Sequence, residues 1–302
     1  MAFTSFSPLK NRIINPIFKH ISTYNYKHPN FIDLRDPLNS GPVCASITTE
    51  SSKKDDKLRS GVEGLPVGLK EELMPKHIAF IMDGNRRWAA EKGWSSMVGH
   101  GAMRMALKPL LRQCSELKIK AVSIYAFSTE NWNRPAEEVN FLMEMFEDLL
   151  SIDAEELLSL GCRISVMGNK TDLSKTLQKL SFEIEQKSQV NLGTHVNFAI
   201  NYSGKYDILQ ACQNIANKVR DGLILPNQID ENTYEQELDT RSNDFPSLDL
   251  VIRTSGEIRL SNFMLWQMAY SELYFVKKYF PDFRKDDLIR VLLAFQESRS
   301  HV

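Results

Sequence analysis

Short apolar runs alternate with longer amphipathic segments along the chain from Met74 onward. Runs of strand length, rich in Ile, Val and Phe, predict β-strands. They lie at His77 to Met82, Lys120 to Ala126, Arg163 to Met167, His195 to Ile200, Leu248 to Ile252 and Glu272 to Val276. Apolar residues at helical spacing predict helices at Gly101 to Leu117, Val139 to Leu160, Leu173 to Lys187, Lys205 to Val219 and Lys285 to Phe295.

The order of these elements predicts an α/β fold. Strand and helix follow one another repeatedly, which favours a single domain with a mostly parallel central β-sheet and helices on both faces. Pro135 stands at an expected first helical position, before the long helix from Val139. A polar region without a clear pattern extends to Ser247.

The N-terminal stretch has a different composition. Residues 1–32 contain Lys10, Arg12, Lys19 and Lys27, no acidic residue, and scattered Ser, Thr and Asn. Because no compact apolar segment is present, this composition favours an organelle transit peptide over a secretory signal. We expect a plastid transit peptide over residues 1–45, a flexible polar linker over 46–73 and a catalytic domain over 74–302. The alternative for the first segment is a disordered tail.

Composition narrows the function classes. The chain has 302 residues with 37 basic and 38 acidic side chains, so its balance of charge gives no sign of nucleic-acid binding. The four cysteines are widely spaced, which excludes a zinc-finger pattern and fits a reducing compartment. No apolar run has the roughly 18 residues that a transmembrane segment requires.

The first candidate for chemistry follows the first strand, where Asp83-Gly84-Asn85-Arg86-Arg87 leads into good helix formers. A helix start offers unpaired backbone N–H groups to an anion, and the arginines add positive charge. Asp83 places a carboxylate at the carboxyl end of the strand, where open α/β sheets bind ligands. Together these groups suggest a diphosphate bridged to Mg²⁺. A solvated Asp-Gly turn explains the same residues.

Two further loops at strand ends are rich in polar side chains. Phe127 to Pro135 follows the second strand and carries an arginine just before a helix, although a capped helix entry explains it equally. Arg253 to Asn262 follows the fifth strand and holds two arginines and several hydroxyl groups around Gly256, which suits a second phosphate group. Two anion sites at neighbouring strand ends, with Asp83, indicate an enzyme that joins two phosphorylated substrates. Nucleotide-binding glycine motifs and the G-x-S-x-G of hydrolases are absent.

Taken together, the loops resemble those of the cis-prenyltransferase family, the undecaprenyl diphosphate synthase type. The matching segments follow the order of the family and cover nearly everything from Met74 to Phe295. They are HIAFIMDGNRRWA, GHGA at Gly99 to Ala102, FSTENWNRPAEEV, NFAINYSGKYDI at Asn197 to Ile208, and DLVIRTSGEIRLSNFMLWQMAYSELYF from Asp249 to Phe275.

The resemblance implies a homodimer with an apolar substrate tunnel and a Mg²⁺-dependent coupling of an allylic diphosphate with a five-carbon isoprenoid diphosphate. Asp83 and Glu272 would hold the metal, and Asn131 and His100 would lie beside the reacting centre with Asp83. The substrate-binding residues would be Gly84, Asn85, Arg86, Arg87, Trp88, Ser128, Trp132, Arg134, Arg253, Arg259 and Ser261. Within this set, Arg87 and Arg134 would bind the allylic diphosphate, and Arg253, Arg259 and Ser261 the second one. Packing alone also explains His100 and Trp132.

Several positions depart from the family pattern. Ser96 and Lys205 replace arginines that members often carry, and the usual terminal Arg-x-Gly is not found before Val302. Plant plastid relatives that make short products, the neryl and lavandulyl diphosphate synthases, share parts of this drift. Met143 and Phe146 could close the tunnel early, although residues at this spacing are more often core.

The sequence therefore predicts an enzyme of the plastid stroma that uses dimethylallyl diphosphate. Irregular coupling of two dimethylallyl diphosphates is slightly favoured over regular cis addition of isopentenyl diphosphate. A long-chain synthase and a non-catalytic binding subunit are the remaining alternatives, and the presence of Asp83, Asn131 and Arg134 argues against the subunit.

Overall fold

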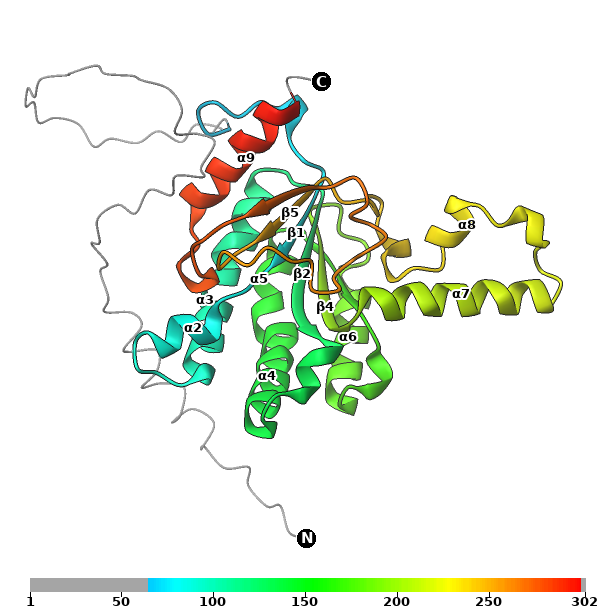
Figure 1. Ribbon diagram of the computed structural model, residues 1–302, viewed down its shortest axis with the longest axis horizontal. Coiled ribbons are helices and arrows are strands. Elements are labelled where there is room, and N and C mark those ends of the chain that lie inside the picture. The colour runs from blue at the N-terminus through cyan, green and yellow to red at the C-terminus, as the bar shows by residue number, and fades with distance from the viewer. Residues whose placement is uncertain (1–64, 300–302) are drawn as a thin grey trace, which may run out of the picture. The chain divides into compact units, whose positions relative to one another are not determined.

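The central element of the computed structural model, which describes residues 65–299, is a parallel sheet of six strands (Figure 1). The predicted parallel arrangement is confirmed, because every neighbouring pair of these strands is parallel. The strands are β1 (His77–Ile81), β2 (Ala121–Ser128), β3 (Arg163–Met167), β4 (His195–Tyr202), β5 (Leu250–Arg253) and β6 (Glu272–Phe275).

The strand order, β3-β4-β2-β1-β5-β6, places β1 in the interior of the sheet. All five residues of β1 are buried, as expected for a strand covered on both faces. Along the chain, β2 pairs with β1, β3 forms the far edge on that side and β4 lies between β3 and β2, after which the chain crosses to the other side of β1 for β5. In open parallel sheets, ligands bind outside the carboxyl ends of the strands at such a reversal. Here that point lies between β1 and β5.

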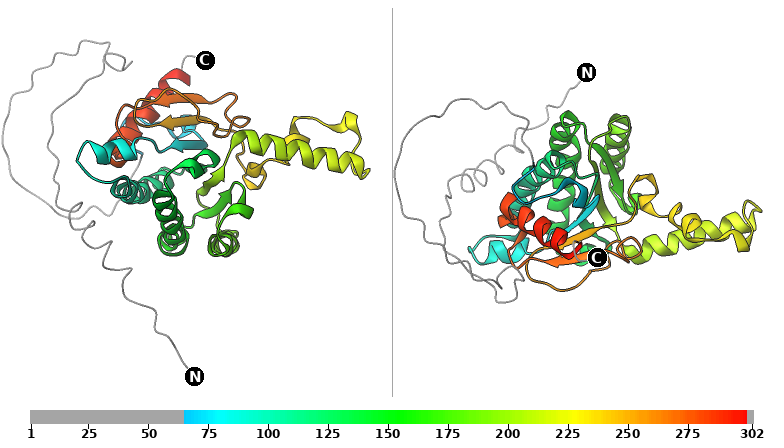
Figure 2. Two further views of the ribbon diagram at one scale, coloured as in Figure 1. Left: turned by 60° about the horizontal axis from the view of Figure 1, so that its bottom comes forward. Right: turned by 90° about the horizontal axis from the view of Figure 1, so that it is seen from above.

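The regular helices are α2 (Asn85–Ala90), α3 (Ser96–Glu116), α4 (Ala136–Asp148), α5 (Ala154–Ser159), α6 (Lys175–Ser188), α7 (Gly204–Arg220), α8 (Glu231–Glu235) and α9 (Lys285–Arg299). Helix α4 packs between α3 and α6, and α6 contacts β3 (Figure 2). Pro135 is not the first residue of α4 but the residue before it. None of the helices within residues 65–299 is both long and apolar enough to cross a bilayer.

A π-helical turn interrupts the helix that the sequence predicted as continuous from Val139 to Leu160. The turn covers Leu149–Asp153 and joins α4 to α5. Arg104 of α3 holds both of its ends, because Nε donates to Asp153 Oδ2 at 2.5 Å and Nη1 donates to Asp148 Oδ2 at 2.9 Å. The two carboxylates therefore face α3 from both sides of the turn.

Helices do not form the whole cover of the sheet. On one face, Ala79, Ile81 and Val251 pack in a buried cluster with Phe263 and Met264, which belong to the long segment between β5 and β6. This segment contains turns but no regular helix. It starts from the Arg253 loop, so the packing of this face also fixes the position of that loop.

The folded body begins earlier than the predicted boundary at residue 74. Leu69 is buried, Glu71–Leu73 forms a 3₁₀ turn (η2), and the Gln296 amide pairs with the backbone of Lys70 at 3.0 and 2.9 Å. The assignment of residues 68–73 to a flexible linker is therefore wrong. The predicted transit peptide over 1–45 and the linker up to residue 64 lie outside the described residues.

Candidate active site

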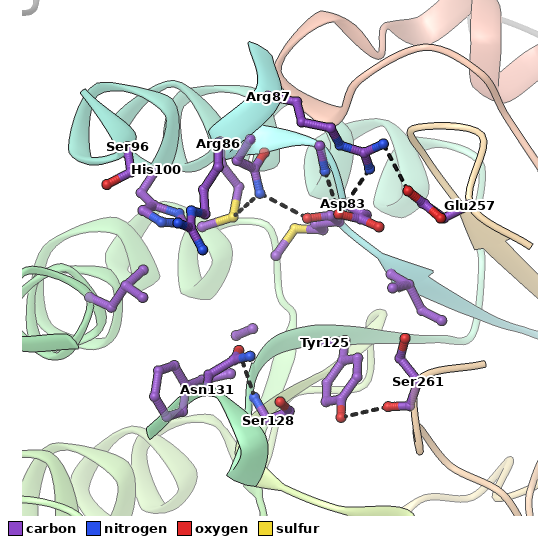
Figure 3. Close-up of a pocket in the computed structure, with 18 of the residues that line it drawn as sticks. Asp83, Arg86, Arg87, Ser96, His100, Tyr125, Ser128, Asn131, Glu257 and Ser261 are labelled. Carbon is purple, nitrogen blue, oxygen red and sulfur yellow. Dashed lines mark hydrogen bonds and ion pairs between the residues drawn. The ribbon is translucent and has the colours of Figure 1, made fainter. Parts of the chain in front are cut away.

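A pocket of about 700 Å³ opens at the carboxyl ends of β1, β2 and β5, beside α2 and α3 (Figure 3). The structure brings most of the predicted site residues together there, although the sequence separates the first from the last by well over a hundred positions. The predicted residues that line it are Asp83, Gly84, Asn85, Arg86, Arg87, His100, Ser128, Asn131, Arg134, Arg253, Arg259 and Ser261.

The loop from Asp83 to Gly84 has a conformation that only glycine accommodates. Gly84 has φ of +98°, and a Cβ there would lie 2.4 Å from the Tyr279 ring and 2.8 Å from Ser255 Cβ. The Asp83 backbone N–H donates to Thr254 Oγ1 at 2.9 Å, and the Gly84 N–H donates to Asp83 Oδ1 at 2.7 Å. The Asp83 carboxylate is therefore fixed at the end of β1, against the end of β5.

Arg253 ties this carboxylate to the loop after β5. Its Nη2 donates to Asp83 Oδ2 at 2.7 Å, and its Nη1 donates to Ser261 Oγ at 2.7 Å and to the carbonyl of Arg259. The Arg253 side chain is only 4% exposed. In this arrangement Arg253 holds the site together from within.

The other two arginines of this region share one carboxylate. Glu257 accepts from Arg87 Nη1 at 2.8 Å and from Arg259 Nη1, and Arg87 also donates to Ser255 Oγ at 2.6 Å. Arg87 and Arg259 are 44% and 57% exposed, so both are accessible from the pocket. We call this group the strand-end cluster: Asp83, Arg87, Arg253, Glu257 and Arg259.

The charges around Asp83 keep it ionised. Burial opposes ionisation, but the hydrogen bond and positive charge of Arg253 outweigh it and hold the pKa of Asp83 below its usual range. Asp83 therefore offers a carboxylate, and not a carboxylic acid, to the pocket at neutral pH.

A second group of charges lies where three helices begin or end. Glu138 near the start of α4 accepts from His100 Nε2 at 2.9 Å and from Arg134 Nη1 at 3.1 Å, and Arg86 Nε lies 3.7 Å from its other oxygen. The side chains of Glu138 and His100 are each 5% exposed. We call this group the helix-end cluster: Arg86, His100, Arg134 and Glu138.

Close helix packing brings His100 to this position. A Cβ at Gly99 would lie 2.1 Å from the Asn85 carbonyl oxygen, so only glycine lets α3 approach α2 this closely. The next residue, His100, then lies beside Arg86 at the pocket wall.

The helix-end cluster has one fixed charge state at neutral pH. The His100 hydrogen bond lowers the pKa of Glu138 to about 2, so this carboxylate is ionised. Burial lowers the pKa of His100 despite the opposing effect of Glu138, so the imidazole is neutral. Among the described residues, His100 Nδ1 is buried without a hydrogen-bond partner.

Each cluster keeps one positive charge that no carboxylate compensates. The strand-end cluster sets three arginines against two carboxylates, and the helix-end cluster sets two arginines against one. Cationic side chains in this arrangement bind phosphate oxygens through charged hydrogen bonds. The pocket can therefore hold two anionic groups side by side.

The side-chain contacts group the arginines differently from the expectation. Arg87 was expected to act with Arg134, but it contacts Glu257 and Asp83 of the strand-end cluster and the nearby Ser255. The partner of Arg134 through Glu138 is Arg86. Successive positions on α2 therefore point toward different clusters.

The inner side of the pocket is lined by apolar side chains. Leu142, Met103 and Phe127 line the main pocket. Beyond Met103 lies a space of only about 10 Å³, walled by side chains that include Leu107, Met145, Phe146 and Leu149. The apolar side of the predicted tunnel therefore narrows to this small space, and Phe146, unlike Met143, lies on its wall.

Three predicted site residues do not line the pocket. Trp88 is buried and donates from Nε1 to Asp282 at 2.9 Å, and Trp132 packs edge-on against Phe127 and donates to Asn201 at 2.8 Å. Both tryptophans therefore contribute to packing. Glu272 is the first residue of β6 and accepts from Ser298 Oγ at 2.6 Å. Because Asp83 follows the carboxyl end of a parallel strand and Glu272 begins one, the two carboxylates of one chain lie at opposite ends of the strands. The predicted role of Glu272 as a second metal ligand would therefore involve a neighbouring copy of the chain, and it stays a prediction.

The sequence analysis did not single out three residues that lie on the pocket wall or directly behind it. Tyr125 stacks on Phe263 and donates to the Ser261 carbonyl at 3.0 Å, which supports the Ser261 loop from below. Glu257 lies in the loop from Arg253 to Asn262 but was not predicted to be a site residue. Glu138 was detectable, because it follows Arg134 by four positions at a helix start, the spacing of an ion pair.

The side chains of the pocket could hold a divalent cation only if a bound ligand supplied further oxygen atoms. Within residues 65–299 no group of three or more His, Cys, Asp or Glu side chains could enclose a metal. Asp83 offers a carboxylate, and the nearby Asn85 Oδ1 is buried without a hydrogen-bond partner. Mg²⁺ is commonly held by one or two carboxylates together with substrate phosphates. The residues present suit that mode.

Comparison with known proteins agrees with this geometry. The family model described as putative undecaprenyl diphosphate synthase matches residues 81–302. A chloroplastic (2Z,6Z)-farnesyl diphosphate synthase of Solanum lycopersicum is 46% identical over 282 residues, 93% of this chain and 93% of that protein. A chloroplastic nerylneryl diphosphate synthase of the same species is 46% identical over 252 residues, 83% and 76% of the two chains.

Among solved structures, similarity extends to a lavandulyl diphosphate synthase from Lavandula x intermedia, determined in complex with dimethylallyl diphosphate. That chain is 42% identical and superposes with a TM-score of 0.73, covering 74% of this chain and 96% of the other.

Proposed function

The chain belongs to the undecaprenyl diphosphate synthase family of prenyltransferases, and from this premise we propose that it joins dimethylallyl diphosphate to a second five-carbon isoprenoid diphosphate. The product is a short-chain prenyl diphosphate. The observation that carries the proposal is the pair of cationic clusters in one pocket whose apolar end is nearly closed.

We assign the allylic diphosphate to the side of the pocket formed by Gly84, Asn85, Arg86 and Arg134. The second diphosphate lies against Arg87, Arg259 and Ser261, with Arg253 holding the loop that carries them. Ser128 and Asn131, joined by a hydrogen bond of 3.2 Å from the Ser128 N–H to Asn131 Oδ1, border the space between the two.

The chemistry follows from this placement. The C–O bond of the allylic diphosphate breaks, and its electron pair leaves with the diphosphate, so negative charge grows where Arg86 and Arg134 point. Fixed cations at that place stabilise the developing charge without reorganising. The alkene of the second substrate then forms the new C–C bond to the allylic cation, and loss of one proton completes the product.

Mg²⁺ is the expected cofactor, with Asp83 as its protein ligand at the diphosphate, where the ion would add further neutralisation of the leaving group. Asn85 lines the same pocket, and its Oδ1, which has no hydrogen-bond partner among the described residues, is available for a water of the hydrated ion.

The nearly closed apolar end favours a short product. A space of about 10 Å³ holds at most about one water molecule, so a further isoprene unit would require side chains such as Phe146 to move. Two observations slightly favour irregular coupling of two dimethylallyl diphosphates. They are the similarity to the lavandulyl diphosphate synthase and the presence on the pocket wall of Ser96, where family members often carry an arginine. The second candidate is regular cis-condensation with isopentenyl diphosphate, which the names of the farnesyl-type and nerylneryl-type relatives favour.

The test incubates the full chain with Mg²⁺ and dimethylallyl diphosphate alone, and then with isopentenyl diphosphate added. Products are dephosphorylated and identified by gas chromatography with mass spectrometry. A branched ten-carbon alcohol from dimethylallyl diphosphate alone would support irregular coupling. A product that requires isopentenyl diphosphate would support the second candidate, and absence of product in both would contradict the proposal.

We further propose that the enzyme is a homodimer in which Glu272 serves the site of the other copy. Glu272 is on the edge strand β6, and Tyr270 and Leu273 beside it are 95% and 43% exposed. Mixing Asp83→Asn with Glu272→Gln protein, each inactive alone, should restore roughly a quarter of wild-type activity after subunit exchange. No restoration after proven exchange would contradict a shared site.

The plastid is the proposed location, because the relatives that carry this similarity are named as chloroplastic. Expression of the full chain with a C-terminal fluorescent tag in leaf cells should give signal within chloroplasts. Signal confined to the cytosol would contradict this placement.

A further inference from the structure

Glu138 is the one member of the helix-end cluster that does not line the pocket. It lies behind the wall, 4% exposed, at the third residue of α4. Its two oxygens contact one residue from α2, one from α3 and one from the loop before α4. A buried carboxylate remains ionised only if its partners compensate for the loss of its hydrating water, and Glu138 has three cationic or proton-donating partners.

The hydrogen bond to His100 determines where the imidazole carries its proton. An ionised carboxylate can only accept, so Nε2 of His100 must be the donor in the contact of 2.9 Å. The neutral ring then has its lone pair on Nδ1, and this atom has no partner within the described part of the chain. Without Glu138, neither tautomer would be preferred on these grounds.

The same carboxylate orients two arginines. Arg134 Nη1 donates to Glu138 at 3.1 Å, and Arg86 Nε lies 3.7 Å from it, while both side chains line the pocket. Each guanidinium thus turns one edge toward Glu138, and its other N–H groups remain available to the pocket. The orientation of three groups that line the pocket therefore depends on one residue behind its wall.

We propose that Glu138 is a positioning residue that holds His100 in the Nε2–H tautomer, leaves Nδ1 as the nitrogen able to take up a proton, and aims Arg86 and Arg134 at the same diphosphate. The role in catalysis rests on the proposed function, whereas the tautomer does not. The charged groups that face His100 are Glu138, Arg134 and Arg86, from α4, the loop before it and α2.

Diphosphate binding should change this cluster in a defined direction. The positive charges of Arg134 and Arg86 now disfavour the imidazolium form of His100. A diphosphate offsets those charges, so it should raise the pKa of His100 and favour a proton on Nδ1, which then donates to a phosphate oxygen. Removing the Glu138 charge should lower the pKa of His100 in both states.

The first experiment measures ¹⁵N shifts of His100 in full-length protein labelled at histidine, assigned with His100→Gln. The wild type at pH 7.5 should show a neutral ring with the proton on Nε2, and Glu138→Gln should show a mixture of tautomers. Inorganic diphosphate should raise the pH at which His100 titrates. A wild-type ring with its proton on Nδ1, or already cationic, would overturn the proposal without any variant.

The second experiment uses Glu137→Gln as a matched control. Glu137 is the exposed neighbour in the same first turn of α4, so this change removes the same charge from the helix start. Glu138→Gln should lower kcat/KM by about 10–100-fold and shift its acid limb to lower pH. Glu137→Gln should do neither. Equal effects of both variants would assign Glu138 a merely structural role.

The experiments distinguish a failure of the proposed function from a failure of the positioning role of Glu138. If no prenyl product forms, the tautomer and its dependence on Glu138 are still read from the ligand-free protein. If prenyl transfer proceeds and Glu138→Gln leaves both tautomer and pH profile unchanged, the function stands and the positioning role is wrong.

Discussion

The strand-end and helix-end clusters use the same residue types in opposite ways. In the strand-end cluster the carboxylates are partly exposed, with Asp83 at 27% and Glu257 at 32%, and the buried member is an arginine. In the helix-end cluster the buried members are the carboxylate Glu138 and His100, and the arginines are accessible. One cluster therefore presents an acceptor to the pocket, and the other presents only donors and a neutral imidazole. This difference suits the proposed roles, in which Asp83 would hold the cation that neutralises the leaving group and the helix-end arginines would bind the departing diphosphate.

Asp83→Asn should have the largest effect, because it removes the carboxylate of this chain that is proposed to hold Mg²⁺. We expect kcat/KM to fall by about 10³-fold or more. The free energy of unfolding should fall by about 1–3 kcal/mol, because the buried Arg253 loses its counter-ion but keeps an acceptor in the amide oxygen. Steady-state assays with saturating Mg²⁺ measure this effect. Activity near that of the wild type would refute the metal-binding role and leave the strand-end cluster as a simple anion site.

Arg253→Gln tests whether the buried arginine supports the strand-end cluster as Glu138 supports the helix-end cluster. Its loss leaves Asp83 and the Ser261 loop without their hydrogen bonds, so the free energy of unfolding should fall by about 2–4 kcal/mol. Denaturant titration measures it. If only catalysis changed, the cluster would not depend on Arg253 for its architecture.

Arg259→Ala should give a smaller and different effect. Arg259 is 57% exposed and has its head group at the pocket, so the KM of the second substrate should rise about tenfold with little loss of stability. Arg290→Ala is the matched control, since Arg290 is also 57% exposed but pairs with Asp287 on α9. An unchanged KM would mean that the second diphosphate lies elsewhere.

The smallest expected effect is the pH dependence of stability. Glu138 has a folded-state pKa of about 2, below its ordinary value of 4.5, so its stabilising contribution is present above pH 4.5 and lost as pH falls toward 2. The difference in unfolding free energy between wild type and Glu138→Gln should shrink by about 1–3 kcal/mol over that window. Using the difference cancels His77 and His195, whose pKa values burial lowers to about 4. A constant difference would contradict the ionised state of Glu138.

Much of the fold could be predicted from periodicity. The strand Arg163–Met167 was predicted at its observed bounds, and the other strands within a few residues. The π turn at Leu149–Asp153 could not be predicted, because no Pro or Gly marks it and the residue that bonds both of its ends, Arg104, lies more than forty positions away. The end of the linker was misplaced for a similar reason, since Lys70 is ordered by Gln296.

The site was predictable where a loop carries its own signal. Asp83 to Arg87 and Arg253 to Ser261 stand at strand ends, and the neighbouring positions of β1 and β5 bring them together. The position of Glu272 could not be predicted, because a motif gives a residue type but not the end of the strand on which it lies. The packing of Trp88 and Trp132 could not be predicted either, because their partners, Asp282 and Asn201, are remote in sequence.

The π turn also determines which changes of length its segment can accept. A π turn contains one residue more than the α-helical path between the same ends, and each residue of a helix advances the chain by about 100°. Deleting the exposed Ser151 would therefore let the segment close as a regular α-helix, with Leu157 still in the core and Asp153 still facing Arg104. Inserting one more residue there would instead rotate α5 by about 100° and turn both side chains away from these positions. The stretch can thus lose a residue but not gain one, and this asymmetry keeps the two halves of the helix in phase.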